Sequence, residues 1–159
     1  MASDFHLVMV APTNFLVPPT SYGGEAFIHT IIKGLERQYP NLRITLLAVH
    51  GSYQSEKTTL LPIRCSHNDW REMVRVEDEL TRDREVLRTV LDCDAIHDFS
   101  HRKTLHDFLR WRYGKRNSLS TLWGSTWDRP LWKENIVVWS QAHHDMGIRG
   151  DTGFEGRGV

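Results

Sequence analysis

A short apolar run, followed at once by a Pro/Gly loop and an amphipathic helix, most constrains how this chain can fold. FHLVMVAP (5–12) is typical of a strand buried on both faces of a parallel sheet. The next apolar residues recur at helical spacing over about 24–39, and Pro40 stops that helix. LRITLLAV (42–49) has the composition of a second buried strand. Strand, helix and strand in this order predict a right-handed βαβ unit.

The rest of the chain continues the alternation. A weaker third strand is expected at 59–65, where Pro62 interrupts it. From Asn68 to Leu91 the spacing predicts one long helix, capped by Asn68, whose charged face is interpreted as a solvated face. The later expected elements are a strand at 94–100, a helix through 105–111, strands at 118–124 and 135–140, and a helix opening within 141–148.

This order predicts an α/β fold, a Rossmann-like open and mostly parallel sheet with helices on both faces. We expect one such domain over residues 1–150. The remaining residues, 151–159, are rich in glycine and charge and indicate a linker or a frayed end.

Composition and charge exclude several classes of protein. The chain has 159 residues, and 20 basic side chains balance 20 acidic ones, so nothing in the bulk charge favours nucleic acid or an acidic membrane. No apolar run is long enough to span a bilayer, and no basic region precedes the first apolar stretch. A cytoplasmic location is therefore expected, with Cys65 and Cys93 as buried small hydrophobes rather than a disulfide.

The loop PPTSYGGE (18–25) stands between the first strand and the first helix. Gly23 and Gly24 carry no Cβ, so their backbone can approach a ligand closely, and a helix N-terminus adds partial positive charge. The loop therefore suits an anionic or polyhydroxylated ligand, although it matches neither a dinucleotide fingerprint nor a P-loop. A simple tight turn is the alternative interpretation.

Histidine is frequent, with nine in the chain. His97 and His101 are four residues apart, but no HExxH or Cys/His quartet occurs, so we expect no metal site. Histidine titrates close to neutral pH, so His101 could transfer a proton or donate a hydrogen bond to a sugar hydroxyl. Asp98 and Glu25 could act as bases, or as a helix cap and a solvated charge.

Two separated motifs carry a family resemblance. Pro-Pro-x-x-Tyr-Gly-Gly (18–24) after the first strand and IHDFSH (96–101) at a later strand end resemble the N-terminal domain of family-4 glycosyltransferases. These are retaining, nucleotide-sugar-dependent enzymes with the two-domain GT-B architecture. The resemblance runs from about Phe5 to Gly150 and is strongest over 18–35 and 94–101. Glu25 departs from the pattern, because the family places its acidic residue two positions after the second glycine.

The resemblance implies roles for particular residues. The glycine-rich loop would approach the phosphates and the sugar of the donor, and a histidine after the later strand would contact the transferred sugar. The implied donor-binding residues are Tyr22, Gly23, Gly24 and Glu25, the catalytic candidates are His101 and then His97, and the candidate acceptor-binding residues are Asp98, Ser100 and Trp127.

The expected function is that of the acceptor-side half of a glycosyltransferase that transfers a hexosyl group from a nucleotide sugar. The resemblance implies a C-terminal nucleotide-sugar domain, which is not among these residues, so catalysis would need that domain or a partner polypeptide. A nucleotide-diphosphate sugar is the expected co-substrate, with no bound cofactor, and a homo-oligomer is left open. The alternatives are a non-catalytic sugar-binding or nucleotide-binding module and an α/β protein-interaction module.

Overall fold

The computed structural model describes residues 4–12, 15–19, 23–65, 70–115, 117–121 and 136–137. Strands and helices mostly alternate along these residues, although the second and third strands follow one another directly and two helices in succession precede the fourth strand. The elements are β1 (Phe5–Val10), α1 (Gly23–Gln38), β2 (Leu42–Val49), β3 (Thr58–Ile63), α2 (Trp70–Leu80), α3 (Arg84–Asp92), β4 (Ala95–Asp98), α4 (Thr104–Tyr113), β5 (Ser118–Thr121) and β6 (Ile136–Val137).

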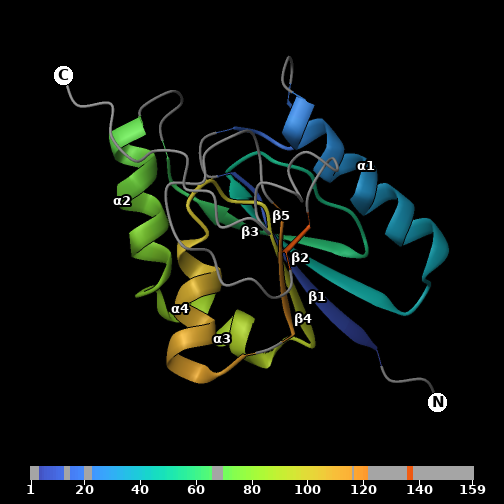
Figure 1. Cartoon of the computed structure of the whole chain (residues 1–159). Helices are drawn as coiled ribbons and strands as arrows, with labels where there is room; N and C mark the ends of the chain where they lie inside the picture. Colours follow the sequence, from blue (N-terminus) through green and yellow to red (C-terminus); the bar gives the residue numbers. More distant parts are fainter. Residues whose placement is uncertain are drawn as a thin grey trace.

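The strands form one parallel sheet in the order β3-β2-β1-β4-β5-β6. Figure 1 shows α1 on one face of this sheet and α2, α3 and α4 on the other. This arrangement is an open, Rossmann-like α/β fold, as the sequence predicts. Pro62 is accommodated because β3 lies at the edge of the sheet, where a missing backbone donor is tolerated.

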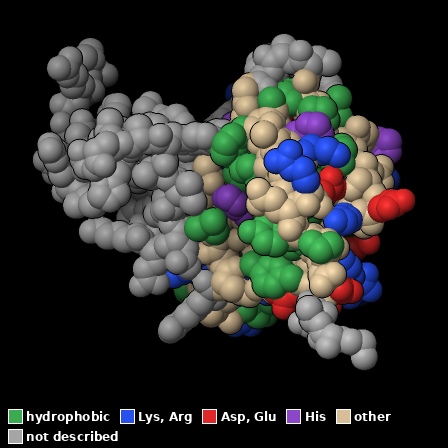
Figure 2. All heavy atoms as spheres, turned by 90° about the vertical axis from the view of Figure 1, so that its right-hand side faces the viewer, with side chains coloured by type: hydrophobic (Ala, Val, Ile, Leu, Met, Phe, Trp, Pro, Cys, Tyr) green, Lys and Arg blue, Asp and Glu red, His purple; other side chains and the backbone are tan. Residues whose placement is uncertain are grey.

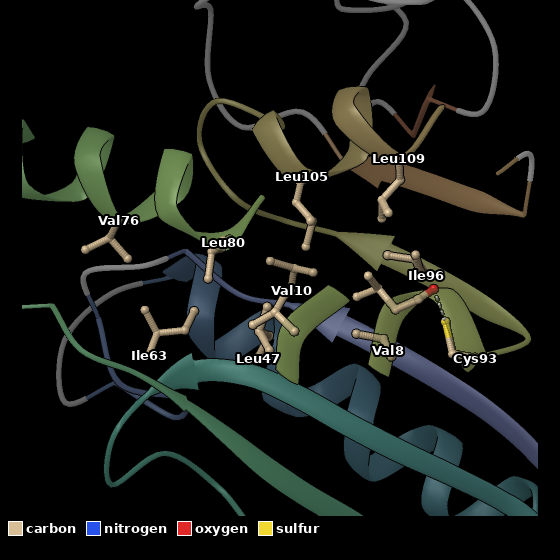
Figure 3. Close-up of a cluster of buried hydrophobic side chains, with 12 residues drawn as sticks. Val8, Val10, Leu47, Ile63, Val76, Leu80, Cys93, Ile96, Leu105 and Leu109 are labelled. Carbon is tan, nitrogen blue, oxygen red and sulfur yellow. Dashed lines mark hydrogen bonds between the residues drawn. The ribbon is translucent and has the colours of Figure 1, made fainter. Parts of the chain in front are cut away.

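Two apolar clusters hold the layers together, one on each face of the sheet. On the α1 face the cluster includes Met9 of β1 together with Ile28 and Ile32 of α1. On the opposite face, side chains of α2 and α4 meet alternate residues of the central strands, as Figure 3 shows. Because β1 contributes Val8 and Val10 to one cluster and Met9 to the other, this strand is buried on both faces, as its sequence predicts.

The prediction of one long helix from Asn68 to Leu91 is wrong. The structure has two helices, α2 and α3, and Asp83 separates them. Asp83 has extended backbone angles, and its carboxylate accepts hydrogen bonds from the N–H groups of Glu85 and Val86 at 2.8 and 3.0 Å. These bonds cap the start of α3, and the buried face of α3 does not continue the buried face of α2. Consequently Val86 is buried, whereas Leu91 of the predicted apolar face is exposed.

The loop between β2 and β3 is hydrogen-bonded to Val17, in the segment that precedes the predicted glycine loop. The hydroxyl oxygen of Ser52 accepts a hydrogen bond from the N–H of Val17 at 3.1 Å, and the N–H of Tyr53 donates to the carbonyl of Val17. The side chain of Val17 is fully buried against the α1 face of the sheet. The chain leading to α1 is therefore anchored by both its backbone and its side chain.

The same loop is bound to α1 through Glu36. The carboxylate accepts hydrogen bonds from the hydroxyls of Tyr53 at 3.0 Å, Thr58 at 2.8 Å and Ser55. Burial alone would raise the pKa of Glu36, but these hydrogen bonds outweigh it and leave the pKa below its ordinary value. Glu36 is therefore bound as a carboxylate in the folded protein.

Replacing Glu36 with alanine should lower the free energy of unfolding by about 2 kcal/mol, because three hydroxyl groups lose their common acceptor. Urea denaturation at pH 7 measures the change. Glu56→Ala is the matched control, because Glu56 is an exposed glutamate of the same loop and should change stability by less than about 0.5 kcal/mol. Equal effects of the two substitutions would contradict the role given to Glu36.

Several other sequence predictions can be placed. Neither Cys65 nor Cys93 forms a disulfide within the described residues. Cys93 is buried in the core as predicted, where its thiol donates to the carbonyl of Val90 (Figure 3), whereas Cys65 is only half-buried. Within the described ranges, no helix is long and apolar enough to cross a membrane. The predictions that lie outside the described residues are the Asn68 cap, the strand continuations at 122–124 and 138–140, the helix within 141–148 and the tail 151–159.

Candidate functional site at the carboxyl ends of β1 and β4

The sheet reverses its winding between β1 and β4. From β1 the chain proceeds outward to β2 and β3, and it then returns to β4 on the other side of β1. The two strands pair with Val10 opposite Asp98, and the N–H of Phe99 donates to the carbonyl of Val10 at 2.7 Å. The two carboxyl ends are therefore level and adjacent. In open α/β sheets, ligands bind at this kind of switch point.

Both sequence motifs follow these two strand ends. The glycine motif leads from β1 into α1, and the histidine motif comprises the end of β4 and the loop after it. Phe99 is fully buried in the same apolar cluster as Val17 and Ile28, so the segment after β4 packs on the same layer as the start of α1. The topology thus brings together two motifs that lie about 75 residues apart in the sequence.

Gly23 is the first residue of α1, and Gly24 lies in the same turn. Gly23 is exposed and does not adopt a positive φ. Among the described residues, no heavy atom other than its chain neighbours and its own helix lies within 4 Å of where a Cβ would stand. Neither backbone conformation nor internal packing therefore requires glycine at position 23. The first N–H groups of a helix have no intrahelical acceptor, so they are available to a ligand.

Glu25 lies in the first turn of α1 and is only 4% exposed. Burial raises the pKa of its carboxyl group, and a hydrogen bond from its own backbone N–H opposes this effect. The side chain is therefore buried against the start of its own helix. Its contact with a donor stays a prediction.

Figure 2 looks onto the α1 side of the molecule, where acidic and basic side chains are interspersed. The described residues give this face no single-sign field, in agreement with the balanced composition. An anion at the start of α1 would therefore depend on backbone N–H groups rather than on a basic surface.

His97 lies on β4 and is half-buried. Its Nε2 lies 2.7 Å from the hydroxyl of Thr121 at the end of β5, and its ring is tilted against Phe99 with centroids 3.9 Å apart. Burial lowers the pKa of His97 to about 4, so the imidazole is neutral near pH 7. A neutral imidazole can form hydrogen bonds at this position, but it holds no surplus proton to give to a leaving group.

Asp98 and Ser100 are buried at the end of β4. The Asp98 carboxylate accepts hydrogen bonds from the N–H groups of Ser100 at 2.8 Å and His106 at 3.2 Å, which links the strand end to α4. Within the part of the chain that the structure describes, the hydroxyl of Ser100 has no hydrogen-bond partner. In this arrangement Asp98 shapes the loop, and acceptor binding by either residue stays a prediction.

His101 is exposed, and its backbone N–H is hydrogen-bonded to a side chain of α2. The carboxylate of Glu77 accepts hydrogen bonds from the N–H groups of His101 and Arg102, both at 3.0 Å. Glu77 is only 1% exposed, so the interpretation of its helix face as solvated is wrong at this position. Of the two histidines proposed for catalysis, His101 is the more exposed, although burial still lowers the pKa of its imidazole.

Lys103 is buried beside Asp98 and Glu77. It is 2% exposed, has a left-handed backbone with φ of 56°, and its ammonium group donates to the carbonyls of Asp98 and Ser100. Burial lowers the pKa of Lys103 to about 8, against the opposing effect of the carboxylates of Asp98 and Glu77. Burial and then the negative charge of Asp98 raise the pKa of Glu77 to about 7. The loop after β4 therefore rests on an internal charge cluster.

Sequence reasoning missed Glu77, Lys103 and Thr121. A signal for Glu77 was present, because Met73, Val76, Glu77 and Leu80 follow the spacing of one buried helical stripe. A charged residue within such a stripe indicates a buried partner. No local signal marks Lys103, because its role depends on a left-handed backbone and on two carboxylates from other elements.

Two proposed residues, Tyr22 and Trp127, lie outside the described residues. Of the others, His97 also borders a shallow hollow of about 350 Å³ on the α1 side of the sheet. Its lining includes Leu7, Ala95 and Leu119 and is mostly apolar, and the hollow extends toward the amino ends of β4 and β5, away from the switch point. We therefore place the candidate site by topology and not by this hollow.

Among the residues that the structure describes, no group of three histidine, cysteine or acidic side chains could hold a metal ion. Comparisons of this chain with protein-family models, with curated proteins and with solved structures found no match. The assignment of the fold accordingly rests on strand order and pairing.

Proposed function

We propose that this chain is the acceptor-side half of a nucleotide-sugar-dependent glycosyltransferase, with its ligand site at the switch point between β1 and β4. The observation that carries the proposal is the position of the two motifs, which follow the carboxyl ends of adjacent strands in a Rossmann-like sheet. In the proposed complex, a C-terminal domain or a partner polypeptide holds the nucleotide and closes over this edge.

The exposed groups at this edge suit particular parts of such a donor. Backbone N–H groups at Gly23 and Gly24, together with the helix dipole, would stabilise the charge of the departing diphosphate. His101 is exposed and would contact the transferred sugar, whereas the neutral ring of His97 would orient a hydroxyl. No metal is needed in this scheme, because backbone dipoles act on the developing negative charge.

Gly23 supports the proposal independently of the resemblance. Glycine is less favourable than alanine in a helix, and at this position neither φ nor packing against the described residues demands it. A ligand that approaches the backbone closely would account for the absence of a side chain.

Binding measurements on two variants of Gly23 test this account. Gly23→Ala should leave the melting temperature unchanged or slightly higher, and Gly23→Val should still fold, because a Cβ meets open space there. If the ligand packs on this backbone, Gly23→Val should weaken binding of UDP-glucose and GDP-mannose by roughly tenfold or more, the equivalent of one lost hydrogen bond. Isothermal titration calorimetry measures the binding, and circular dichroism verifies the fold.

An unchanged dissociation constant in Gly23→Val would contradict close approach of the ligand. Gly34→Val provides the matched control, because Gly34 also lies in α1 and no described residue lies within 4 Å of an added Cβ, yet it is far from the start of the helix.

A second candidate function is ligand binding without chemistry. It is favoured by the burial of Glu25 and Asp98, because neither carboxylate is exposed for use as a base. This candidate predicts binding of a nucleotide or sugar by the chain with no turnover under any combination of partners.

A further inference from the structure

The loop from Phe99 to Lys103 connects β4 to α4 and carries the exposed side chain of His101. Glu77 reaches this loop from α2, and each of its carboxylate oxygens accepts one of two consecutive backbone N–H groups, those of His101 and Arg102. We propose that Glu77 is a positioning residue, whose carboxylate fixes the loop so that His101 is presented to a ligand at the switch point. The presentation of His101 to a ligand rests on the proposed function, whereas the fixing of the loop by Glu77 does not.

The hydrogen bonds of Glu77 leave little freedom to the backbone that they join. Both distances are 3.0 Å, and one oxygen serves each N–H, so two neighbouring peptide groups are fixed by one side chain. The side chain of Arg102 adds a second link to the same helix, because its guanidinium donates to Asp78 at 3.1 Å and lies 3.4 Å from the carbonyl of Val74.

Packing alone does not account for a carboxylate at this position. Glu77 lies on the buried stripe of α2 with Met73, Val76 and Leu80, where an apolar side chain would fill the space without the penalty of burying charge. A glutamine would offer only one acceptor oxygen, and its NH₂ group would face a second N–H donor. Only the ionised carboxylate satisfies both N–H groups.

Several groups face this carboxylate and determine its charge. They come from β4, from the loop and from the start of α4, whereas Asp78 faces the guanidinium of Arg102. Among the described residues, the groups around Glu77 are Asp98, His101, Arg102 and Lys103, and His106 donates its backbone N–H to Asp98. Burial and Asp98 favour the protonated form of Glu77, whereas the two N–H groups and Lys103 favour the carboxylate.

This balance makes the position of the loop depend on protons. Because the pKa of Glu77 is raised to about 7, the side chain changes between its two forms near neutral pH. Above this pH both oxygens accept hydrogen bonds and hold His101 in place. Below this pH, one oxygen of Glu77 carries a proton and is a weaker acceptor, so one of the two backbone N–H groups is less well hydrogen-bonded.

Nuclear magnetic resonance spectroscopy tests the loop directly. In the wild type, the amide proton resonances of His101 and Arg102 should shift together between pH 5.5 and 8.5 with one midpoint near pH 7. In Glu77→Gln the shift common to both amides should disappear, and the His101 amide should keep only the titration of its own imidazole, whose pKa burial lowers. Glu79→Gln is the control on the same helix, because Glu79 is exposed and pairs with Arg75, and it should behave like the wild type.

Calorimetric binding of UDP-glucose and GDP-mannose by the same three proteins tests the effect on the ligand. The wild type should bind more tightly at pH 8 than at pH 6, whereas Glu77→Gln should bind roughly tenfold more weakly than the wild type at pH 8 and lose the pH dependence. Amides of His101 and Arg102 that do not titrate in the wild type would overturn the proposal. Equal affinities of the wild type and Glu77→Gln would also overturn it and leave the proposed function intact.

If the wild type binds neither probe, alone or together with any polypeptide encoded immediately downstream, the proposed function and the positioning of His101 for a ligand are both overturned. The amide titration distinguishes this outcome from a failure of the loop contact, because it requires no ligand.

Discussion

Replacing Lys103 with methionine is expected to lower the free energy of unfolding by about 3–5 kcal/mol. The ammonium group of Lys103 is the cation that faces the buried carboxylates of Asp98 and Glu77, and it also donates to two backbone carbonyls in the loop after β4. Methionine would fill a similar volume, and it would adopt the same left-handed backbone as lysine. The difference between the two proteins therefore isolates the charge and its hydrogen bonds.

Urea denaturation at pH 7.5 measures this loss. Lys33→Met is the matched control, because the Lys33 side chain is 55% exposed and its ion pair with Glu36 is screened by solvent, so its loss should change stability far less. Adding Glu77→Gln to Lys103→Met should recover part of the stability, since one of the two uncompensated carboxylates is then removed. A Lys103→Met variant as stable as the wild type would show that the cluster needs no internal cation.

The second large effect concerns the pH dependence of stability through Glu77. The pKa of this group is about 7 in the folded protein against an ordinary value of 4.5, so the folded state holds the proton more tightly than the unfolded state. The advantage of the wild type over Glu77→Gln should therefore be largest below about pH 4.5 and should fall as the pH rises through 7. The total change should be about 3 kcal/mol.

Parallel denaturation curves of the wild type and Glu77→Gln between pH 4.5 and 8.5 give this difference directly. An advantage of the wild type that instead grows with pH would mean that the pKa of Glu77 is lowered in the folded protein. Such a result would contradict the burial of an ionisable carboxyl against Asp98. The predicted trend also means that the form of Glu77 that holds the loop most firmly is the one that stabilises the fold least.

The central part of the fold could be predicted because its local signals agree with its tertiary environment. The apolar run of β1, the helical spacing of α1 and the β-branched run of β2 each point to a buried element, and the structure has all three within one or two residues of the predicted limits. The position of the candidate site followed from this order, since the switch point depends on topology and not on any single side chain.

The parts that could not be predicted depend on contacts between distant elements. Asp83 ends one helical phase and starts another, and in a highly charged segment its capping role was obscured by neighbouring acidic residues. Glu77 and Lys103 are separated by 26 positions in the sequence and become partners only when α2 and the loop before α4 pack together. The spacing of residues along the chain therefore does not predict this contact.

A donor-consumption assay tests the central claim most directly. The 159-residue chain would be incubated with a panel of nucleotide sugars, alone and with any polypeptide encoded immediately downstream, and release of nucleoside diphosphate would be followed. The account predicts release only in the combined sample, retention of this activity in Gly34→Val and its loss in Gly23→Val. Failure of every sample to release nucleoside diphosphate, with no binding of any nucleotide sugar by the chain, would contradict a glycosyltransferase site between β1 and β4.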